Sequence, residues 1–285
     1  MNNRILITGA TDGIGKETAL EMAGMGYTVI LHGRNPSKLA DTKAGILGSY
    51  PSASLETIIA DFSSLQQINN MAAEMNERFP GLDVLVNNAG VYMRKRVTSQ
   101  DSFELTFAVN YLATFSLTMQ LLPLLAKSPS AKIINMGSVG HRYVWVNPLD
   151  IESKHFFWSW VNYCRSKLLI IPFTFKLAEE LKNKHITINA LHPGVIRGTQ
   201  ITSTAFIPSG LPLSYGVKTL VNLITNPELE GLSGHYIERF KISRPSPIAM
   251  NMRLRGSLWQ KSFRWAGLNQ KEYECLLTGL NQNVQ

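Results

Sequence analysis

The feature that most restricts the fold of this chain is a regular alternation between short apolar runs and longer helical stretches. Helices are expected from about Gly13, from near Pro36 and from Ser64 to Phe79. Seven runs around them have the composition of β-strands: Ile5–Ile7, Thr28–Leu31, Leu55–Ala60, Asp83–Val86, Lys132–Asn135, Ile186–Ala190 and Gly234–Ile237. Continuous apolar strands that alternate with helices predict a parallel sheet covered by helices on both faces.

Right-handed crossovers between such strands give a doubly wound, Rossmann-type α/β fold with a mostly parallel seven-stranded sheet. The chain has 285 residues, of which 45% are hydrophobic and 17% charged, as in a globular protein with a substantial core. No linker, composition break or internal repeat divides it. We therefore expect a single domain over residues 1–285.

The sequence favours a reducing compartment. Two cysteines, Cys164 and Cys275, are too few for a disulfide framework, and Cys164 is expected to be a packed thiol. The first residues lead directly into a strand and lack the pattern of a signal peptide, so we expect a cytoplasmic protein. The stretch from Leu105 to Ala126 has no charged residue, but its polar side chains and Pro123 favour a helix buried against the sheet.

The net charge of +8 is concentrated toward the C-terminus. Between Arg239 and Arg264 there are seven Lys or Arg residues and no Asp or Glu. A solvated basic surface over about residues 239–285 is one interpretation, and an amphipathic element in weak contact with a membrane surface is the other. The membrane-facing set would be Arg253, Arg255, Leu258, Trp259, Phe263 and Trp265. Nucleic-acid binding is not expected, because no recognised binding motif accompanies the charge.

Two strand ends point to a dinucleotide. The first strand runs into Thr8-Gly9-Ala10-Thr11-Asp12-Gly13-Ile14-Gly15, where glycines let the backbone approach a pyrophosphate at a helix N-terminus. A tight turn alone would also use glycine. The second strand ends in His32-Gly33-Arg34-Asn35, with no acid for a ribose 2′-hydroxyl and with Arg34 available for a 2′-phosphate. This pattern favours NADP(H) over NAD(H).

Polar residues follow the next two strands as well. Asp61-Phe62 ends the third strand, and Asn87-Asn88-Ala89-Gly90 ends the fourth. Both lie at the carboxyl edge of the expected sheet, where open α/β folds bind ligands. Either segment could equally be a plain turn.

Ser138, Tyr163 and Lys167 carry the chemistry. Tyr163 and Lys167 are four residues apart, so they share one face of a helix, although many such pairs are ordinary surface neighbours. A free phenol has a pKa of about 10, and a nearby ammonium lowers that pKa. The pair could then transfer a proton to a carbonyl oxygen as hydride arrives, with Ser138 hydrogen-bonding the same oxygen.

Taken together, these motifs resemble the short-chain dehydrogenase/reductase family over nearly the whole chain. The resemblance rests on the glycine turn, Asp61, Asn87 to Gly90, Asn110, Ser138, Tyr163-Cys164-Arg165-Ser166-Lys167 and Pro193-Gly194. It implies a catalytic tetrad of Asn110, Ser138, Tyr163 and Lys167, in which Asn110 holds a water that links Lys167 to solvent. It implies no metal, and it places the cofactor along Gly9, Thr11, Asp12, Gly13, Ile14, Gly15, Arg34, Asp61, Phe62, Asn88, Ala89, Gly90, Tyr163, Lys167, Pro193, Gly194, Val195, Ile196 and Thr199.

Within the family the chain is similar to the retinol dehydrogenase-related branch. The step of 25 residues from Ser138 to Tyr163 and the run Gly231-Leu232-Ser233-Gly234-His235-Tyr236 fit that branch. The segment at about 199–218, which usually forms the substrate lid, is short. An insert from His141 to Trp160 could line the substrate, pack internally or contact another subunit through Trp145, Phe156, Phe157, Trp158 and Trp160.

The working hypothesis is an NADP(H)-dependent oxidoreductase that transfers a hydride to or from a carbonyl or alcohol on a mostly apolar substrate. One alternative is a non-catalytic NADP-binding sensor or scaffold, and another is a retinoid- or lipid-type reductase at a membrane surface. The sequence leaves a monomer, dimer or tetramer open, as it does the direction of the reaction and the identity of the substrate.

Overall fold

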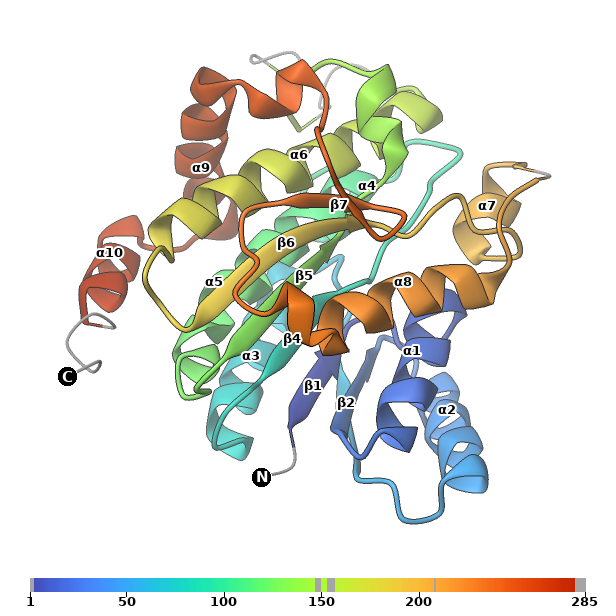
Figure 1. Cartoon of the computed structure of the whole chain (residues 1–285). Coiled ribbons are helices and arrows are strands. Elements are labelled where there is room, and N and C mark those ends of the chain that lie inside the picture. The colour runs from blue at the N-terminus through green and yellow to red at the C-terminus, as the bar shows by residue number, and fades with distance from the viewer. Residues whose placement is uncertain (1–2, 147–149, 153–156, 208, 280–285) are drawn as a thin grey trace.

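One eight-stranded sheet organises the chain (Figure 1). The computed structural model describes residues 3–146, 150–152, 157–207 and 209–279. The strand order is β3-β2-β1-β4-β5-β6-β7-β8, and every neighbouring pair is parallel except β7 and β8. The strands are β1 Arg4–Ile7, β2 Thr28–Gly33, β3 Leu55–Ile59, β4 Val84–Asn87, β5 Ala131–Met136, β6 Ile186–His192, β7 Tyr236–Glu238 and β8 Lys241–Ser243.

The doubly wound fold and the single domain are confirmed, but the strand count was wrong. The eighth strand, β8, is antiparallel to β7 and forms the edge of the sheet. The turn between β7 and β8 consists of Arg239 and Phe240, whose φ angles are 51° and 66°. Hairpin turns of this kind normally carry Asn or Gly, so the sequence contained no signal for the hairpin.

Helices cover both faces of the sheet (Figure 1). The residues of β1 show why: Ile5 and Ile7 pack on one side and Leu6 on the other, all fully buried. The first side is covered by α1 Gly13–Gly24, α2 Pro36–Ser49 and α8 Leu213–Thr225. The second is covered by α3 Leu65–Arg78, α4 Leu105–Phe107, the π-helical turn Ala108–Leu112, α5 Ala113–Leu125 and α6 Ser159–Glu180, with α9 Met252–Ala266 and α10 Gln270–Gly279 outside them.

The N-termini of three helices are fixed by side chains that the sequence supplies. Asp12 accepts a hydrogen bond from Gly13 N at α1, Asn35 accepts one from Lys38 N at α2, and Ser64 accepts one from Gln67 N at α3. Each acceptor satisfies a backbone N–H group that the helix itself leaves unpaired. These caps place the beginning of each helix directly after a strand, at the edge of the sheet where the site lies.

The long uncharged segment is a core helix, as expected. Leu105–Leu125 is long and apolar enough to cross a membrane, and 83% of its most apolar window is buried inside the protein. It packs mainly against α3. Burial against protein, with Asn110 and Thr118 hydrogen-bonded inside, is typical of a helix in a protein core.

The apolar side of the basic C-terminal segment also faces inward. On α9, Leu258, Trp259 and Phe263 are buried against α5 and α6, and the Trp259 ring lies 5.9 Å from Phe115. Arg255 is buried as well and pairs with Glu179 of α6. Leu258, Trp259 and Phe263, which an amphipathic membrane element would present to the bilayer, are therefore covered by protein instead.

Candidate active site

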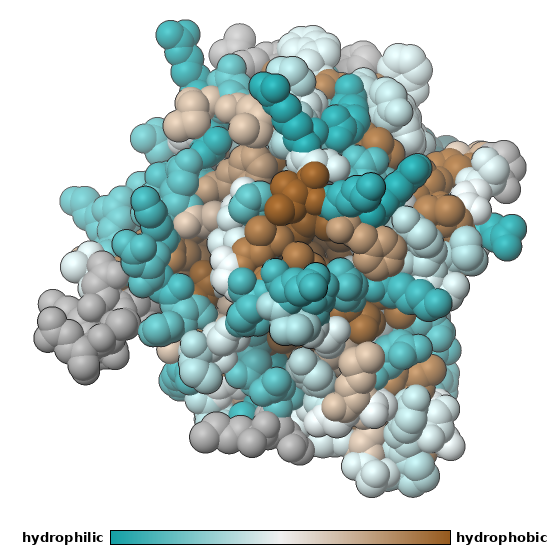
Figure 2. Space-filling view, in the orientation of Figure 1, coloured by the Kyte–Doolittle hydropathy of each residue, from teal (hydrophilic) through white to brown (hydrophobic). Residues whose placement is uncertain are grey.

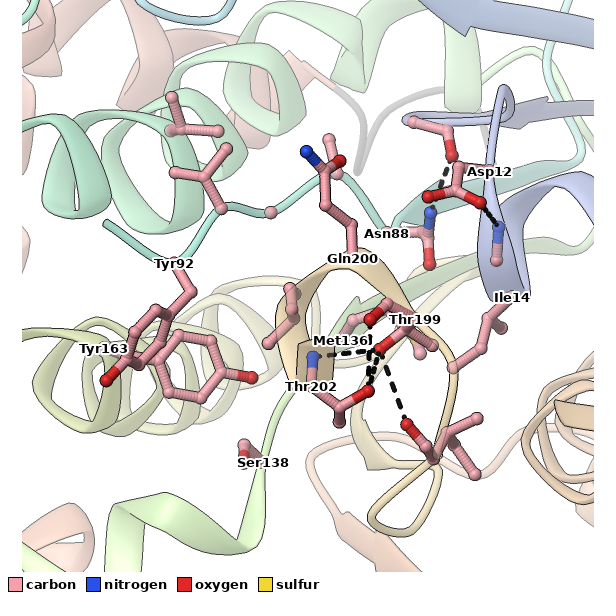
Figure 3. Close-up of a pocket in the computed structure, with 18 of the residues that line it drawn as sticks. Asp12, Ile14, Asn88, Tyr92, Met136, Ser138, Tyr163, Thr199, Gln200 and Thr202 are labelled. Carbon is pink, nitrogen blue, oxygen red and sulfur yellow. Dashed lines mark hydrogen bonds between the residues drawn. The ribbon is translucent and has the colours of Figure 1, made fainter. Parts of the chain in front are cut away.

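A cavity of about 290 Å³ opens along the carboxyl ends of the strands. Figure 3 shows Asp12, Ile14 and Asn88 at one end, Tyr92, Tyr163 and Ser138 at the other, and the segment from Thr199 to Thr202 between them. All the site residues expected from the sequence line this cavity except two, Gly15 and Asn110. Segments from six strand ends, β1 to β6, and from α6 thus meet in one place.

The glycine turn after β1 is shaped by close backbone packing. Gly9 has a φ of 66°, and a Cβ atom there would lie 2.9 Å from the Cα of Ala89. A Cβ on Gly15 would lie 2.3 Å from the carbonyl oxygen of Gly9. The Asn88 amide donates hydrogen bonds to the carbonyl oxygens of Thr8 and Gly9 at 2.8 and 3.1 Å. Gly15 is thus required for packing beneath the turn, while Gly9 and Gly13 border the cavity itself.

His32, at the end of β2, supports the same turn and was not identified as a site residue from the sequence. Its Nδ1 accepts a hydrogen bond from Gly9 N at 3.2 Å, and its Nε2 lies 3.1 Å from Ala60 O. Because a backbone N–H can only donate, Nδ1 is unprotonated and Nε2 carries the hydrogen. The ring stacks on Phe62 with centroids 4.3 Å apart, and burial lowers the pKa of His32 to about 4.

Arg34 follows His32 by two residues and is exposed at the mouth of this end of the cavity. Asp61, at the end of the neighbouring β3, lies on the same cavity wall and accepts a hydrogen bond from Ser63 N at 2.9 Å. Both residues lie at the carboxyl edge of the sheet, because strand ends that adjoin in a parallel sheet meet at one edge.

At the other end, Tyr163 and Lys167 project from α6 beside Ser138, which follows β5. Burial raises the pKa of Tyr163 to about 12, although a hydrogen bond with Ser138 works in the opposite direction. Burial also lowers the pKa of Lys167 to about 8, and its Nζ donates a hydrogen bond to Met136 O at 2.8 Å. The expectation that Lys167 lowers the pKa of Tyr163 is wrong for this structure, because loss of solvent outweighs the other influences on the phenol.

Asn110 lies behind the cavity, within the π-helical turn Ala108–Leu112. Its Oδ1 accepts a hydrogen bond from Val91 N at 2.7 Å, and its Nδ2 donates to Val91 O and to Ser166 Oγ, each at 3.0 Å. Gly90 separates it from the lysine: a Cβ there would lie 3.3 Å from Asn110 Oδ1 and 3.6 Å from Lys167 Nζ. Asn110 therefore ties the loop after β4 to α6, and its side chain does not line the cavity.

Aromatic rings flank the tyrosine. The ring of Tyr163 lies 5.6 Å from Tyr92 and 6.3 Å from Trp160. Of the five insert residues considered from the sequence, only Trp160 lines the cavity among those described. Trp145 and Trp158 are 62% and 63% exposed, Phe157 is half-buried, and Phe156 lies outside the described residues. Tyr92 was missed because no pattern marks a single tyrosine in a loop.

The segment after Pro193-Gly194 covers the cavity. Thr199 caps the short helix α7 Gln200–Thr204, and lining residues continue to Ile207. The expected lid at 199–218 is thus shorter, since α8 begins at Leu213 and packs against α1.

Arg94, in the loop after β4, holds this lid. Its Nε donates a hydrogen bond to Thr204 O at 2.8 Å, and its guanidinium lies 3.7 Å from the centre of the Phe206 ring. The carbonyl oxygen of Arg94 accepts a hydrogen bond from Ser159 Oγ at 2.8 Å. Arg94 therefore connects the β4 loop to α7 through its side chain and to the start of α6 through its carbonyl oxygen. Phe206 itself is 75% exposed and has a φ of 55°, a strained conformation for a large side chain.

Among the described residues, no group of three or more His, Cys, Asp or Glu side chains is arranged to hold a metal ion. The groups that the site offers are instead a glycine-lined turn at a helix N-terminus, an exposed arginine, and a hydroxyl–phenol–ammonium set. A turn of the first kind fits a pyrophosphate, and the last set fits proton transfer to an oxygen atom.

Comparison with known proteins agrees with this arrangement. A family model described as short chain dehydrogenase matches residues 3–207. The chain belongs to this family of oxidoreductases. Human retinol dehydrogenase 13 is 34% identical over 280 residues, which cover 93% of this chain and 84% of that protein. The resemblance to the retinol dehydrogenase-related branch is thereby confirmed.

Solved structures of other proteins share the fold. An uncharacterised protein from Mycobacterium paratuberculosis superposes with a TM-score of 0.79 at 24% identity, covering 94% of each chain. A short-chain dehydrogenase from Escherichia coli CFT073 complexed with NADPH has a TM-score of 0.69 at 26% identity, covering 85% of this chain and 98% of that one. Family membership makes the chain an oxidoreductase of nicotinamide-dependent type that acts on CH–OH or C=O groups.

Proposed function

We propose that the protein reduces a carbonyl group on a mostly apolar, uncharged substrate with NADPH, in a reaction that is chemically reversible. The observation that carries this proposal is a single cavity with the glycine turn at one end and Ser138, Tyr163 and Lys167 at the other. One cavity thus contains both groups that the reaction needs, a turn that can hold the cofactor phosphates and a residue that can donate a proton.

The preference for NADPH rests on Arg34. A 2′-phosphate at the end of β2 would meet a guanidinium there, and β2 ends without a carboxylate that would repel it. Charge-assisted contacts of this kind are worth about 1.5–3 kcal/mol. The E. coli relative with NADPH bound is consistent with the same choice.

The bound cofactor would supply the hydride, and the residues of this chain would supply the proton and its placement. Ser138 donates a hydrogen bond to the carbonyl oxygen, and Tyr163 transfers its phenolic proton to that oxygen as the carbon is reduced. Because burial raises the pKa of Tyr163 to about 12, the phenol keeps its proton at neutral pH. A protonated acid is what reduction requires, so the raised pKa of Tyr163 is consistent with its proposed role as the proton donor.

The substrate end of the cavity explains the apolar preference. Tyr92, Trp160, Val139, Ile201 and Ile207 line it. Arg34 and Lys167 are the only cations in the described lining, and Arg94 is engaged with the lid. At this end of the described lining a substrate carboxylate would meet no cation other than the buried Lys167, whose Nζ is hydrogen-bonded to Met136 O, and buried apolar area would dominate binding. The name of the human relative, retinol dehydrogenase 13, agrees with an apolar alcohol or aldehyde.

The test is the consumption of NADPH and NADH, side by side, against a panel of apolar aldehydes and ketones. We expect turnover with NADPH and a loss of about 100-fold or more in kcat for Tyr163→Phe, with NADPH binding unchanged. The variant keeps the ring and removes only the hydroxyl. Full turnover by Tyr163→Phe would refute the mechanism, and NADPH binding without turnover on any substrate would favour the sensor.

We further propose that the protein is cytoplasmic. Two free thiols, one buried at Cys164 and one exposed at Cys275, support a reducing compartment. The burial of the α9 apolar face argues against attachment to a membrane through that helix. Lack of binding to anionic vesicles at low salt would remove the remaining membrane-surface alternative.

A further inference from the structure

Directly behind Ser138 lies a buried histidine that makes two hydrogen bonds to the main chain. The Nδ1 of His141 is 2.6 Å from the carbonyl oxygen of Ser138, and its Nε2 is 3.1 Å from the backbone N of Ser246. The side chain is fully buried. The two contacts join the end of β5 to the segment that follows β8, which is more than a hundred residues away in the chain.

The partners fix the protonation of the ring. Ser246 N–H can only donate, so Nε2 must be the unprotonated acceptor. Ser138 O can only accept, so Nδ1 must carry the hydrogen. His141 is therefore a neutral imidazole of the Nδ1–H tautomer, and no other state satisfies both partners at once.

The surroundings keep the ring neutral. Tyr236 lies edge-on with its ring centre 4.8 Å away, and burial is the main cause that lowers the pKa of His141. The charged groups that act on it are Arg142, which disfavours protonation, and Glu238, which favours it; those two form an ion pair at 3.2 Å. Nearby His192 is itself buried and has a pKa lowered to about 4.

The turn that His141 holds has little freedom to move. Ser138 Oγ accepts a hydrogen bond from Gly140 N at 3.1 Å, which begins the 3₁₀ turn Val139–Tyr143. A Cβ on Gly140 would lie 2.8 Å from Cys164 Sγ, so the turn is in contact with α6 directly beside Tyr163. A shift of the Ser138 main chain would therefore change the position of its hydroxyl relative to Tyr163.

We propose that His141 is a positioning residue, which holds the main chain at Ser138 through its Nδ1–H and anchors it to the C-terminal segment through Nε2. The proposal rests on the proposed function, in which Ser138 orients the carbonyl oxygen. Misplacement of a catalytic group by about 1 Å can cost on the order of 100-fold in rate, so a second anchor on Ser138 has a measurable effect.

Two substitutions separate the two contacts. In His141→Asn the side-chain amide nitrogen takes the place of Nδ1 and can still donate a hydrogen bond to Ser138 O. In His141→Gln the longer side chain takes the place of Nε2, so it can accept a hydrogen bond from Ser246 N but no longer donates one to Ser138 O. We expect His141→Asn to keep kcat within about threefold of the native protein and His141→Gln to lose about tenfold or more. KM for NADPH should stay unchanged in both. His185→Asn, at an exposed histidine far from the cavity, is the matched control.

A purely structural role predicts another pattern, in which both variants lose activity in proportion to their loss of thermal stability. Equal loss in the Asn and Gln variants, or no loss in either, would overturn the proposal. Ser138→Ala separates it from the proposed function: full turnover by that variant contradicts the role of Ser138 itself. If Ser138→Ala is inactive while both His141 variants are fully active, only the positioning role fails.

A measurement on the native protein does not depend on how the variants fold. Nitrogen-15 NMR of labelled histidines distinguishes a protonated Nδ1 from a protonated Nε2. The His141 signal, assigned by its disappearance in whichever His141 variant folds, should have the pattern of the Nδ1–H tautomer at neutral pH. The Nε2–H pattern or a cationic ring would refute the geometry on which the proposal depends.

Discussion

Acid should destabilise this protein through His32, before most carboxylates are protonated. The pKa of His32 is lowered from 6.5 to about 4 by burial, so the folded state resists a proton that the unfolded chain accepts. The stabilising contribution is complete above the unfolded pKa and is lost as the pH falls from about 6.5 toward about 4. Protonation would also remove the lone pair that accepts the Gly9 N–H, and with it the support of the glycine turn.

The magnitude follows from the two pKa values. At pH 7 both states are largely unprotonated, whereas at pH 5 the unfolded histidine is almost fully protonated and the folded one is not. The difference corresponds to about 2 kcal/mol of unfolding free energy between those two pH values. His192, whose pKa is also lowered to about 4 by burial, adds a similar amount to the native protein.

Urea unfolding of the native protein and of His32→Gln, each at pH 7 and pH 5, measures this directly. The variant will be less stable at both pH values, but its loss between them should be smaller than the native loss by about 2 kcal/mol. His185→Gln, at an exposed position, should leave the pH dependence as it is. An identical pH dependence in native protein and His32→Gln would show that His32 takes up its proton freely in the fold, and the reasoning would fail.

Three other predictions follow from the geometry of the site and the core. In initial-rate measurements with both cofactors, Arg34→Gln should raise KM for NADPH by about tenfold or more and leave KM for NADH nearly unchanged. Lys38→Gln is the control, and equal effects on both KM values would contradict the role of Arg34. Arg94→Met loses the contact with Phe206 and should speed NADPH release about three- to tenfold in stopped-flow fluorescence, whereas the control Lys95→Met should not. An unchanged release rate in Arg94→Met would show that this contact does not hold the lid. Trp259→Ala should lower the unfolding free energy in urea by about 3–5 kcal/mol without changing KM for NADPH, and a loss below about 1 kcal/mol would mean that α9 is not packed as described.

The helix layer also bears on assembly, which the sequence left open. α9 covers the outer side of α5 and α6, where Trp259 and Phe263 pack against Phe115 and Phe173. Another copy of the chain could not pair through this face without displacing α9. We therefore expect that any dimer of this chain forms through a surface other than the outer side of α5 and α6.

Several parts of the site were predictable because they depend only on local patterns. Glycines at Gly9 and Gly13, the absence of an acid beside Arg34, and the spacing of Tyr163 and Lys167 are all properties of short segments. The parallel sheet then brings the ends of its strands to one edge, so the shared location of Asp61, Asn88 and Ser138 followed from the alternation of strands and helices alone.

Other features depend on contacts between distant segments, and no local pattern reports them. The role of His32 requires Gly9 and Ala60 on either side of its ring, and that of His141 requires Ser246. The edge strand β8 follows a turn without turn-forming residues. The error about the Tyr163 pKa has the same origin, because charge could be read from the spacing of residues but burial could not.

What the sequence determined by itself was therefore the type of sheet, the family and the set of reactive groups, since periodicity and motif spacing are encoded in neighbouring residues. Only the tertiary structure decided which of those groups are buried and which main-chain atoms they form hydrogen bonds with. Solvent loss and hydrogen bonding set protonation states, and those states depend on side chains contributed from across the whole fold. The protonation states of the Tyr163 hydroxyl, the Lys167 ammonium and the His141 imidazole are therefore properties of the folded chain.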